Sequence, residues 1–276
     1  MRKISIIGLG WLGMPLAQAL QSSGMQVVGS KTTPDGVEAA CMCGMDCYLL
    51  NLNPEIICRL DDLEQLMLVD VLVLTLPVNG VAGGGEGYIK AVQLIVDTAL
   101  SYSVPRIIFT SSTSVYGSSV GYLNEDESLC PETPSAKTLV ELENWLHKLP
   151  NTSVDILRLA GLVGNERHAG RFLAGRKEMG GGEKAVNLVH QDDVISAIKL
   201  LIQQPEGGHI YNLCAPIHPK RSEFYPLVSR RLNLAPPEFL QSENKTVESK
   251  VIDGSRICRD LGFEYQFPDP SRMPMN

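Results

Sequence analysis

The stretch Ile6–Gly13 reads IIGLGWLG and places glycines at positions 8, 10 and 13, in the spacing G-x-G-x-x-G. Each glycine has a separate physical reason in a dinucleotide-binding turn. Gly8 permits a tight turn, Gly10 lets the backbone approach a pyrophosphate, and Gly13 lets a helix pack closely on the preceding strand. The pattern alone is weak evidence, so its flanking sequence decides whether it predicts a binding site.

The flanking sequence supplies the strand–turn–helix context that the pattern needs. The apolar, β-branched run Lys3–Ile7 predicts a strand, and the spacing of apolar residues in Leu12–Ser22 predicts a helix. Backbone amides at the start of this helix, at Trp11, Leu12 and Gly13, would then face an anion at the positive end of the helix dipole. We therefore expect these residues to bind the cofactor phosphates together with Gly8 and Gly10.

Strand-like and helix-like runs alternate along the rest of the first half. This β-α-β-α order predicts an α/β fold, a Rossmann-like doubly wound parallel sheet with right-handed crossovers. The expected further strands are Gln26–Gly29, Cys47–Leu50, Val69–Leu76, Arg106–Thr110 and Val154–Leu159, and the expected helices are Tyr88–Tyr102 and Ser135–Lys148.

The pattern changes from about Gly164, where glycine-rich and basic segments begin. We expect a dinucleotide-binding core over residues 1–163. Residues 164–276 are expected to form a small C-terminal substrate lobe, with elements at about 186–214 that return to the core. Among these elements, Val194–Gln203 is predicted to be a helix and His209–Leu213 a strand.

Composition narrows the function classes. The chain has 276 residues, 44% of them hydrophobic, and a formal net charge of −7. An acidic chain without a basic cluster is not expected to bind nucleic acid or an anionic membrane. The apolar N-terminal run is broken by glycines and Pro15, which argues against a targeting segment, and no apolar run reaches the roughly 18 residues of a membrane span. We predict a cytoplasmic protein.

Three of the seven cysteines, Cys41, Cys43 and Cys47, form a C-x-C-x3-C cluster. Metal sites usually show C-x2-C pairs with a second pair of ligands further along the chain. We predict buried or unused thiols and no metal site, with metal or redox use as the alternative.

The end of the second strand should contact the adenosine ribose. Sites for NAD place a carboxylate about 20 positions after the glycines, where it binds the 2′-hydroxyl. This chain has Ser30-Lys31-Thr32-Thr33 there and no carboxylate. A lysine among hydroxyls suits a 2′-phosphate, which favours NADP over NAD. The alternative is that Lys31 is a solvated loop residue.

Ligands of such sheets bind at the carboxyl ends of the strands. Leu76 and Pro77 end one strand and are expected to contact the cofactor. The stretch Phe109–Gly117 reads FTSSTSVYG and ends another, so Thr110 and Ser111 are expected at the cofactor as well. Gly83–Gly85 lies at the same end and is expected to fold over the cofactor.

The motifs GLGWLG, FTSSTSVYG, DILRLAGLVG and LVHQDDV together resemble the extended short-chain dehydrogenase/reductases, the NAD-dependent epimerase/dehydratase superfamily, over roughly Met1–Leu201. The whole sequence is most similar to the bacterial YeeZ group of atypical members. The resemblance implies a nicotinamide-dependent oxidoreductase or epimerase that acts on a small hydroxyl or carbonyl substrate, such as a sugar nucleotide, and that forms a homodimer, and Lys31 favours NADP as its cofactor. It also implies that Leu162 and Val163 contact the nicotinamide.

The family's catalytic pattern is only partly present. By resemblance, Ser112 binds the reacting oxygen of the substrate. In the family's Y-x-x-x-K pair, Lys137 matches the lysine but Thr133 stands in place of the tyrosine. A threonine hydroxyl cannot be tuned toward neutral pH as a phenol can. Thr133 followed by Pro134 is better interpreted as a helix N-cap, and Lys137 either binds the ribose or is an exposed lysine near Glu141.

Other candidates for the acid/base stay open. Tyr116, Tyr122 and Glu132 each lie close enough in the sequence to be considered, although the resemblance implies that Tyr116 is structural. The missing tyrosine gives an alternative function, an NADP(H)-binding redox sensor or regulatory protein without turnover.

Two later segments also carry a functional and a structural interpretation. His190-Gln191-Asp192-Asp193 places a histidine beside paired carboxylates, which suits a proton relay or a metal, but it is interpreted as a helix start that Asp192 or Asp193 caps. The basic run from Arg167 to Lys177 either binds a substrate anion or is a solvated loop.

Overall fold

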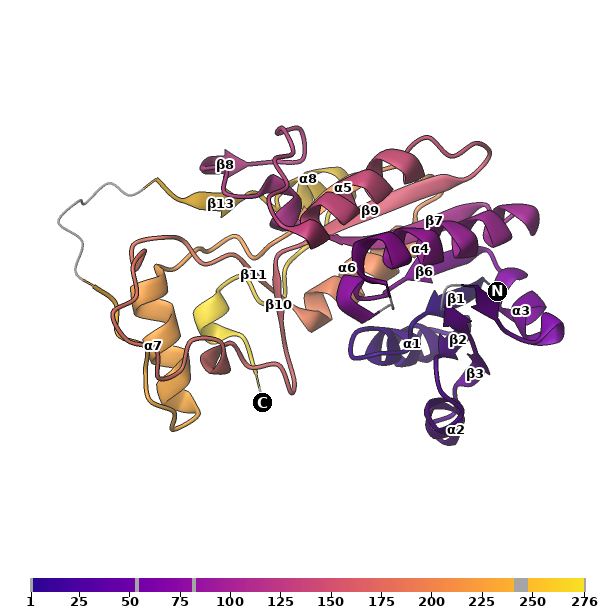
Figure 1. The fold of residues 1–276 in the computed structure, drawn as a ribbon, viewed down its shortest axis with the longest axis horizontal. Coiled ribbons are helices and arrows are strands. Elements are labelled where there is room, and N and C mark those ends of the chain that lie inside the picture. Colours follow the sequence, from indigo (N-terminus) through magenta and orange to yellow (C-terminus); the bar gives the residue numbers. More distant parts are fainter. Residues whose placement is uncertain (1, 53–54, 81–82, 241–247, 276) are drawn as a thin grey trace. The chain divides into compact units, whose positions relative to one another are not determined.

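A seven-stranded parallel sheet forms the centre of the computed structural model, which describes residues 2–52, 55–80, 83–240 and 248–275 (Figure 1). The strand order is β12-β9-β7-β6-β1-β2-β3. The strands are β1 Lys3–Ile7, β2 Gln26–Lys31, β3 Asp46–Leu49, β6 Val71–Leu74, β7 Arg106–Ser112, β9 Ser153–Leu159 and β12 Ile210–Leu213. The predicted Rossmann-like α/β fold is confirmed, and each predicted strand exists with its ends shifted by a few residues.

Six described helices lie between the strands of the sheet along the chain: α1 Gly13–Ser22, α2 Pro34–Met42, α3 Leu60–Met67, α4 Gly84–Ser101, α5 Pro134–Leu146 and α6 Gln191–Gln203. Two more described helices, α7 Arg221–Arg231 and α8 Arg256–Leu261, follow its last strand, β12. Short strand pairs complete the described structure: β4 Asn51–Leu52 with β5 Ile56–Ile57, β8 Gly121–Leu123 with β13 Lys250–Ile252, and β10 Gly161–Val163 with β11 Leu188–His190. The short 3-10 helices are η1 Val78–Gly80, η2 Thr113–Tyr116, η3 Ala169–Arg171 and η4 Pro270–Arg272.

The chain divides into two compact units. Unit 1 comprises Met1–Val115, Pro131–Leu157 and Ile198–Ile210, and unit 2 comprises Tyr116–Cys130, Arg158–Ala197 and Tyr211–Asn276. These units follow contacts within the chain. The domain boundary expected after residue 163 stays a prediction.

The core of unit 1 is built on strands that are covered on both faces. All four residues of β6 are buried, as the nearly continuous apolar run Val69–Leu76 predicts for a strand inside a parallel sheet. Helix α4 buries an apolar stripe at helical spacing against this core, including Tyr88, Val92, Ile95 and Val96. A fixed sheet of this kind holds the loops at its carboxyl end in defined positions.

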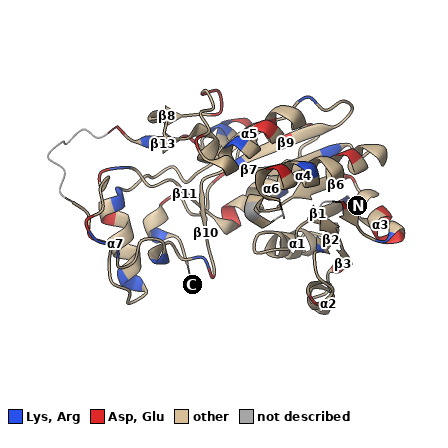
Figure 2. Cartoon of the chain, in the orientation of Figure 1, with Lys and Arg blue, Asp and Glu red and all other residues tan. Residues whose placement is uncertain are grey.

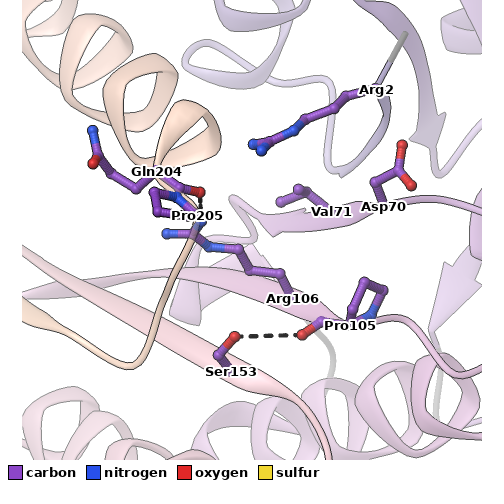
Figure 3. Close-up of a pocket in the computed structure, with 8 residues that line it drawn as sticks. All are labelled: Arg2, Asp70, Val71, Pro105, Arg106, Ser153, Gln204 and Pro205. Carbon is purple, nitrogen blue, oxygen red and sulfur yellow. Dashed lines mark hydrogen bonds between the residues drawn. The ribbon is translucent and has the colours of Figure 1, made fainter.

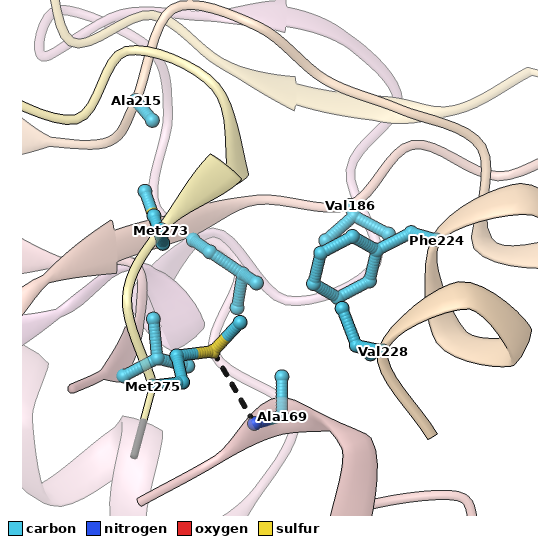
Figure 4. Packing of buried hydrophobic residues seen from close by; sticks show 9 residues of the cluster. Ala169, Val186, Ala215, Phe224, Val228, Met273 and Met275 are labelled. Atoms are coloured by element: carbon cyan, nitrogen blue, oxygen red, sulfur yellow. Dashed lines mark hydrogen bonds between the residues drawn. The ribbon is translucent and has the colours of Figure 1, made fainter. Parts of the chain in front are cut away.

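Unit 2 has a separate apolar cluster (Figure 4). It gathers residues from several segments of the unit: Val163, Ala169, Val186, Leu188, Ala215, Phe224, Val228, Met273 and Met275. The C-terminal segment takes part through its methionines, and the Ala169 amide donates to the Met275 thioether sulfur at 3.5 Å. This segment is therefore a component of the core of unit 2.

The glycines of Gly83–Gly85, which are expected to fold over the cofactor, lie at the start of helix α4. Gly83 is the N-cap residue of α4, with φ +84°, and Gly84 and Gly85 form the first turn. A Cβ on Gly85 would lie 2.4 Å from the Thr138 hydroxyl oxygen on α5. These glycines start a helix and let it approach its neighbour, and the expectation that Gly83–Gly85 folds over the cofactor stays a prediction.

Two features bear on membrane and metal binding. Among the described residues, no helix is both long and apolar enough to cross a membrane. Within the same ranges, no three His, Cys, Asp or Glu side chains gather as a metal-binding group.

Candidate functional site

The glycine turn joins β1 to α1 through a tight backbone reversal. Gly8 has φ +104°, a conformation that residues with a side chain rarely adopt. The Gly10 amide donates to the Gly8 carbonyl at 2.8 Å, and the Leu9 amide donates to the Ser30 carbonyl at 2.9 Å. The buried Ser30 hydroxyl also accepts from the Gly8 amide at 3.2 Å. The turn is thereby tied to the end of β2.

The other two glycines differ in what surrounds them. A Cβ on Gly13 would lie 2.1 Å from the Gly8 carbonyl oxygen, so packing of the helix on the turn excludes any side chain there. A Cβ on Gly10 would meet nothing within 4 Å. Gly10 is therefore not required by packing, and the open space beside its backbone is what a pyrophosphate would need.

The start of α1 is suited to an anion. Leu12 is its N-cap residue and has no side chain that can bind the free amides of the first turn. The first turn also contains no acidic residue. The positive end of the helix dipole is therefore not neutralised by the helix's own side chains.

A cavity of about 560 Å³ opens beside this turn. Seven residues that the sequence predicts as cofactor ligands line it: Gly8, Gly10, Ser30, Lys31, Thr32, Leu76 and Pro77. Thr33, from the segment expected at the ribose, lines it as well. Sequence reasoning missed another set that lines the same cavity: Ile7, Leu9, Leu50, Asn51, Leu52 and Gly80. Leu50–Leu52 follow β3, the neighbour of β2, so the carboxyl end of the third predicted strand was the signal that could have found them. We call this space the glycine-turn cavity.

Lys31 sets the charge of the glycine-turn cavity. Of the fourteen described residues that line it, Lys31 alone is charged. The Ser30 hydroxyl already accepts from the turn, and the Thr33 hydroxyl caps α2 by accepting from the Gly36 amide at 3.2 Å. Lys31 and the exposed Thr32 are therefore the groups left for a ligand at this end.

The hydroxyl cluster at the end of β7 is divided between two faces. The Thr110 hydroxyl donates to the Leu74 carbonyl at 3.0 Å, and the buried Ser111 hydroxyl donates to the buried Glu143 carboxylate on α5. The Ser112 hydroxyl oxygen accepts from the Ser114 amide at 3.1 Å, which leaves its hydrogen for an external acceptor. Ser112 is thus the best placed of the three to bind a substrate oxygen, and the cofactor contacts of Thr110 and Ser111 stay predictions.

Helix α5 begins as the sequence predicts. Thr133 is the N-cap and its hydroxyl accepts from the Ala136 amide at 3.1 Å, while Pro134 follows at the first helical position. Lys137, one turn further on, is exposed. The N-cap interpretation of Thr133 is confirmed, and the binding role of Lys137 stays a prediction.

Tyr116 is held inside unit 2. Its side chain is fully buried, and its hydroxyl accepts from Arg158 at 2.8 Å and contacts Asn212 at 2.9 Å. Burial raises the pKa of the Tyr116 phenol, against the lowering effect of the Arg158 cation. A buried phenol in such a network is structural, so Tyr116 is not available as an acid/base.

Comparisons with known proteins agree with this geometry. The sequence matches the NAD dependent epimerase/dehydratase family over residues 4–214. The chain belongs to this family. Protein YeeZ of Escherichia coli strain K12 is 59% identical over 275 residues and is matched along its whole length, as is this chain. The resemblance to the epimerase/dehydratase family and its YeeZ group is thereby confirmed.

Two solved structures share the fold of this epimerase/dehydratase family member. A short-chain dehydrogenase/reductase superfamily protein from Agrobacterium tumefaciens, solved with bound NAD, has a TM-score of 0.75 and 18% identity over 98% of this chain and 94% of that chain. A UDP-glucose 4-epimerase from Thermotoga maritima, solved with UDP-glucose, has a TM-score of 0.75 and 18% identity over 96% of this chain and 94% of that chain. At such identities the likeness shows the fold alone.

The remaining candidates for this family's active site lie in different surroundings. Leu162, on β10, is half-buried, whereas Val163 is fully buried in the apolar cluster of unit 2. Tyr122 is 79% exposed on β8, and Glu132 is exposed before α5. Their predicted contacts with cofactor or substrate stay predictions, and that of Val163 would require it to leave the core.

Unit 2 of this family member contains a small cationic cavity of about 220 Å³. Its lining includes Lys184, Arg221 and Lys250, with Glu248 as the single acidic residue among the described residues that line it. A Cβ on Gly181 would lie 3.5 Å from both the Arg221 guanidinium and the Lys184 Cε, so these two cations are neighbours. We call this space the cationic pocket; Figure 2 shows the cations on α7.

The basic run predicted from sequence lies elsewhere in unit 2. Arg171, Arg176 and Lys177 are exposed, and Lys177 approaches Glu238 at 3.6 Å. None of these residues is among the described residues that line the cationic pocket. The solvated-loop interpretation fits them better than substrate binding.

The segment at the start of α6 has a structural use. The helix begins at Gln191, so Asp192 and Asp193 lie in its first turn. The buried Asp193 carboxylate accepts from the Gln266 and Phe267 amides at 2.7 and 3.2 Å. Asp193 therefore ties the C-terminal segment to this helix, in place of the predicted helix cap.

The cysteine cluster is only partly buried. Cys41 and Cys43 are exposed free thiols, whereas Cys47 is buried on β3. Burial, with a further contribution from Cys41, raises the pKa of the Cys47 thiol to about 11. Cys47 is a buried thiol, as one form of the prediction has it, and for the exposed Cys41 and Cys43 the other form, unused thiols, stays a prediction.

Proposed function

We propose that the protein binds NADP(H) in the glycine-turn cavity and acts as an oxidoreductase or epimerase on a small hydroxyl or carbonyl substrate. The observation that carries this proposal is the convergence of seven sequence-predicted residues on one cavity, beside a Gly10 backbone with open space around it. When bound, the nicotinamide accepts or supplies a hydride. The chain's own residues hold the cofactor and orient the substrate.

The choice of NADP rests on charge. Lys31 is the only cation among the described residues of the cavity lining, and no described residue of that lining is acidic. A carboxylate that would accept from a ribose 2′-hydroxyl is therefore not part of this lining, whereas an ammonium group can form a charge-assisted contact with a 2′-phosphate. The neighbouring Thr32 is exposed and can donate to the same group.

Ser112 is proposed to polarise the reacting oxygen of the substrate. Its hydroxyl hydrogen is free to point toward that oxygen, because the Ser114 amide already occupies one of the oxygen's acceptor sites. Lys137 is proposed to bind the nicotinamide ribose from the first turns of α5. A proton donor of suitable pKa is not among the residues assigned here, since Thr133 caps a helix and Tyr116 is buried.

The cationic pocket is proposed to bind the anionic part of the substrate. Lys184, Arg221 and Lys250 outnumber Glu248 in its lining, and Lys184 has no acidic partner among the described residues. Neighbouring cations repel each other, and a bound phosphate would relieve that repulsion. A sugar nucleotide supplies such a group, as does the UDP-glucose bound to the Thermotoga maritima 4-epimerase.

A second candidate function is an NADP(H) sensor without turnover. The specific observation in its favour is Thr133, which occupies the family's tyrosine position and serves as an N-cap. The sensor and the enzyme share the cofactor site and differ in the need for Ser112. The implied homodimer and cytoplasmic location stay predictions under either function.

Titration of NADPH and NADH tests the shared part of both functions. We expect NADPH to bind more tightly, and we expect Gly10→Glu to abolish binding by placing a carboxylate where the pyrophosphate would lie. An absence of NADP(H) affinity in the native protein would contradict both functions.

Assays of hydride transfer with UDP-sugars distinguish the enzyme from the sensor. Nicotinamide absorbance and product analysis measure the turnover. Loss of turnover in Ser112→Ala with NADPH binding retained supports the enzyme. Absence of turnover in both forms across the substrates tried supports the sensor.

A further inference from the structure

A second cavity, of about 470 Å³, lies within unit 1 at the amino ends of the strands (Figure 3). It is lined by residues just before or at the starts of β1, β6, β7 and β9 and after α6: Arg2, Asp70, Val71, Pro105, Arg106, Ser153, Gln204 and Pro205. The glycine-turn cavity lies at the other end of β1, whose five residues span roughly 16 Å. This amino-edge cavity is therefore separate from the proposed cofactor site.

Arg106 gives the amino-edge cavity a buried cation. Its side chain is 8% exposed, and it donates from Nε to the Asp155 carboxylate at 2.8 Å and from Nη1 to the Gln204 carbonyl at 2.8 Å. The Nη2 atom lies 2.7 Å from the same Asp155 oxygen but makes no hydrogen bond and is buried. A guanidinium group has five N–H donors, and those on Nη2 have no hydrogen-bond partner among the described residues.

Asp155 neutralises Arg106 without using up those donors. Its other carboxylate oxygen accepts from the Gly208 and His209 amides, both at 3.1 Å. The carboxylate thus accepts on both oxygens, and its 2.7 Å approach to Nη2 is an ion pair without hydrogen-bond geometry. An acceptor from outside the chain would complete the hydrogen bonding of Arg106.

Arg2 adds a second guanidinium to the lining (Figure 3). It is exposed, and its side chain has no hydrogen-bond or ion-pair partner among the described residues. Asp70 carries the one opposing charge of the lining, and its carboxylate already accepts from the Lys3 amide at 2.7 Å. Asp155 already neutralises Arg106. Arg2 is therefore the guanidinium of the lining whose charge has no ion-pair partner among the described residues, and the one carboxylate of the lining, that of Asp70, is engaged with the backbone.

The remaining lining decides what kind of anion fits. Val71, Pro105 and Pro205 provide apolar walls, and the volume lies within the usual range for small-molecule sites. Guanidinium groups bind carboxylates and phosphates through paired N–H donors. We propose that the amino-edge cavity is a second binding site, for a small organic anion that joins a carboxylate or phosphate monoester to an apolar body.

The test uses four probes on the full-length protein by calorimetry and ligand-observed NMR: benzoate, phenyl phosphate, inorganic phosphate and the neutral benzamide. At least one of the two organic anions is expected to bind saturably, and more tightly than its control, which is benzamide for benzoate and inorganic phosphate for phenyl phosphate. The preferred organic anion tells a carboxylate site from a phosphate site. Binding is expected to persist with saturating NADPH, because the two cavities are separate.

Arg2→Ala is expected to weaken binding of the preferred anion about tenfold, because one charge-assisted contact is lost. Arg59→Ala, at an exposed arginine outside the cavity, is the matched control and should bind like the native protein. Arg106→Lys retains charge but not the paired donors, and should also weaken binding in a protein whose Tm and NADPH affinity show that it is folded.

The proposal is wrong if no probe binds saturably, if Arg2→Ala binds as well as Arg59→Ala, or if NADPH displaces the anion. Benzamide binding as tightly as benzoate, with no preference for phenyl phosphate over phosphate, would also overturn it. Failure here leaves the proposed cofactor site unaffected, since NADPH titration tests that site separately.

Discussion

The glycine-turn cavity and the cationic pocket are built to meet anions in different ways. The first offers backbone amides at a turn and a helix start, with Lys31 as its one charged residue among those described. The second offers side-chain cations from three separate segments, with little backbone geometry in common. A backbone site requires residues without bulky or acidic side chains, whereas a side-chain site requires residues with cationic side chains. Substitutions in the two regions should therefore have different effects on stability and on ligand binding.

The largest effect is expected from Gly13→Ala. The added methyl group would lie 2.1 Å from the Gly8 carbonyl oxygen, and neither backbone can move without breaking the turn. We expect a loss of about 3 kcal/mol in the free energy of unfolding, measured by urea denaturation.

Gly10→Ala is the matched control for this prediction. Its methyl group meets nothing within 4 Å, so unfolding should be nearly unchanged while NADPH affinity falls. Equal losses of stability in the two variants would show that Gly10 and Gly13 do not differ in how tightly they are packed.

The next largest effect is expected in the cationic pocket. Replacing both Lys184 and Arg221 with alanine removes two adjacent cations, and affinity for UDP should fall roughly 100-fold, since each charge-assisted contact contributes about 1.5 kcal/mol. NADPH affinity should stay unchanged. Arg176→Ala, at an exposed arginine of the basic run, serves as the control, and calorimetry gives both affinities. If the control alone weakens UDP binding, the basic run and not the pocket holds the anion.

A smaller effect is expected at Lys31, the one charged element of the backbone site. Lys31→Ala should weaken NADPH binding about tenfold and leave NADH binding unchanged, because only NADPH carries the 2′-phosphate. Fluorescence titration of both cofactors measures this, with Lys90→Ala on α4 as the control for loss of an exposed lysine. Equal weakening of both cofactors would place Lys31 at a part of the dinucleotide that they share.

The smallest effect is expected from pH, and it belongs to unit 2. Burial lowers the pKa of His168, with help from Arg171 and Arg231, and burial also lowers the pKa of His218. The unfolded chain, with its ordinary pKa near 6.5, then takes up protons before the folded chain does. The contribution of these neutral histidines to the free energy of unfolding is therefore fully present above about pH 6.5, and it declines as the pH falls through that value.

His168→Asn isolates this contribution. Asparagine can still accept from the Gly170 amide, as the His168 ring does at 2.9 Å, but it does not titrate. The fall in Tm between about pH 7 and pH 5.5 should be shallower in this variant than in native protein. His147→Asn, at an exposed histidine of unit 1, should keep the native slope. A slope that is the same in both variants would remove His168 as the cause.

Sequence reasoning succeeded where a local rule fixes the structure. The glycine spacing, the run Val69–Leu76 and the pair Thr133-Pro134 each depend on neighbours within a few positions, and each gave the correct element. It did not reach features that depend on tertiary packing. Gly85 leaves room for the Thr138 hydroxyl on α5, and no neighbour of Gly85 in the sequence indicates that contact.

The candidate site divides in the same way. Residues that follow β1 and β2 could be assigned because strand ends at one sheet edge meet. The cationic pocket could not, since Lys184, Arg221 and Lys250 come from segments whose meeting depends on the fold of unit 2. The amino-edge cavity could not be predicted for a related reason. Arg106 and Asp155 are far apart in the sequence, and an arginine at the start of a strand does not by itself indicate a binding site.

The methionines of the apolar cluster in unit 2 have a consequence for synthesis of the protein. Met273 and Met275 belong to the same apolar cluster as Val163, so that cluster cannot be completed until the ribosome has released the chain through residue 275. Throughout elongation the residues of this cluster that have already been synthesised would leave apolar surface exposed to water. Cells that make this protein therefore have a period in each translation cycle when chaperone capture competes with aggregation.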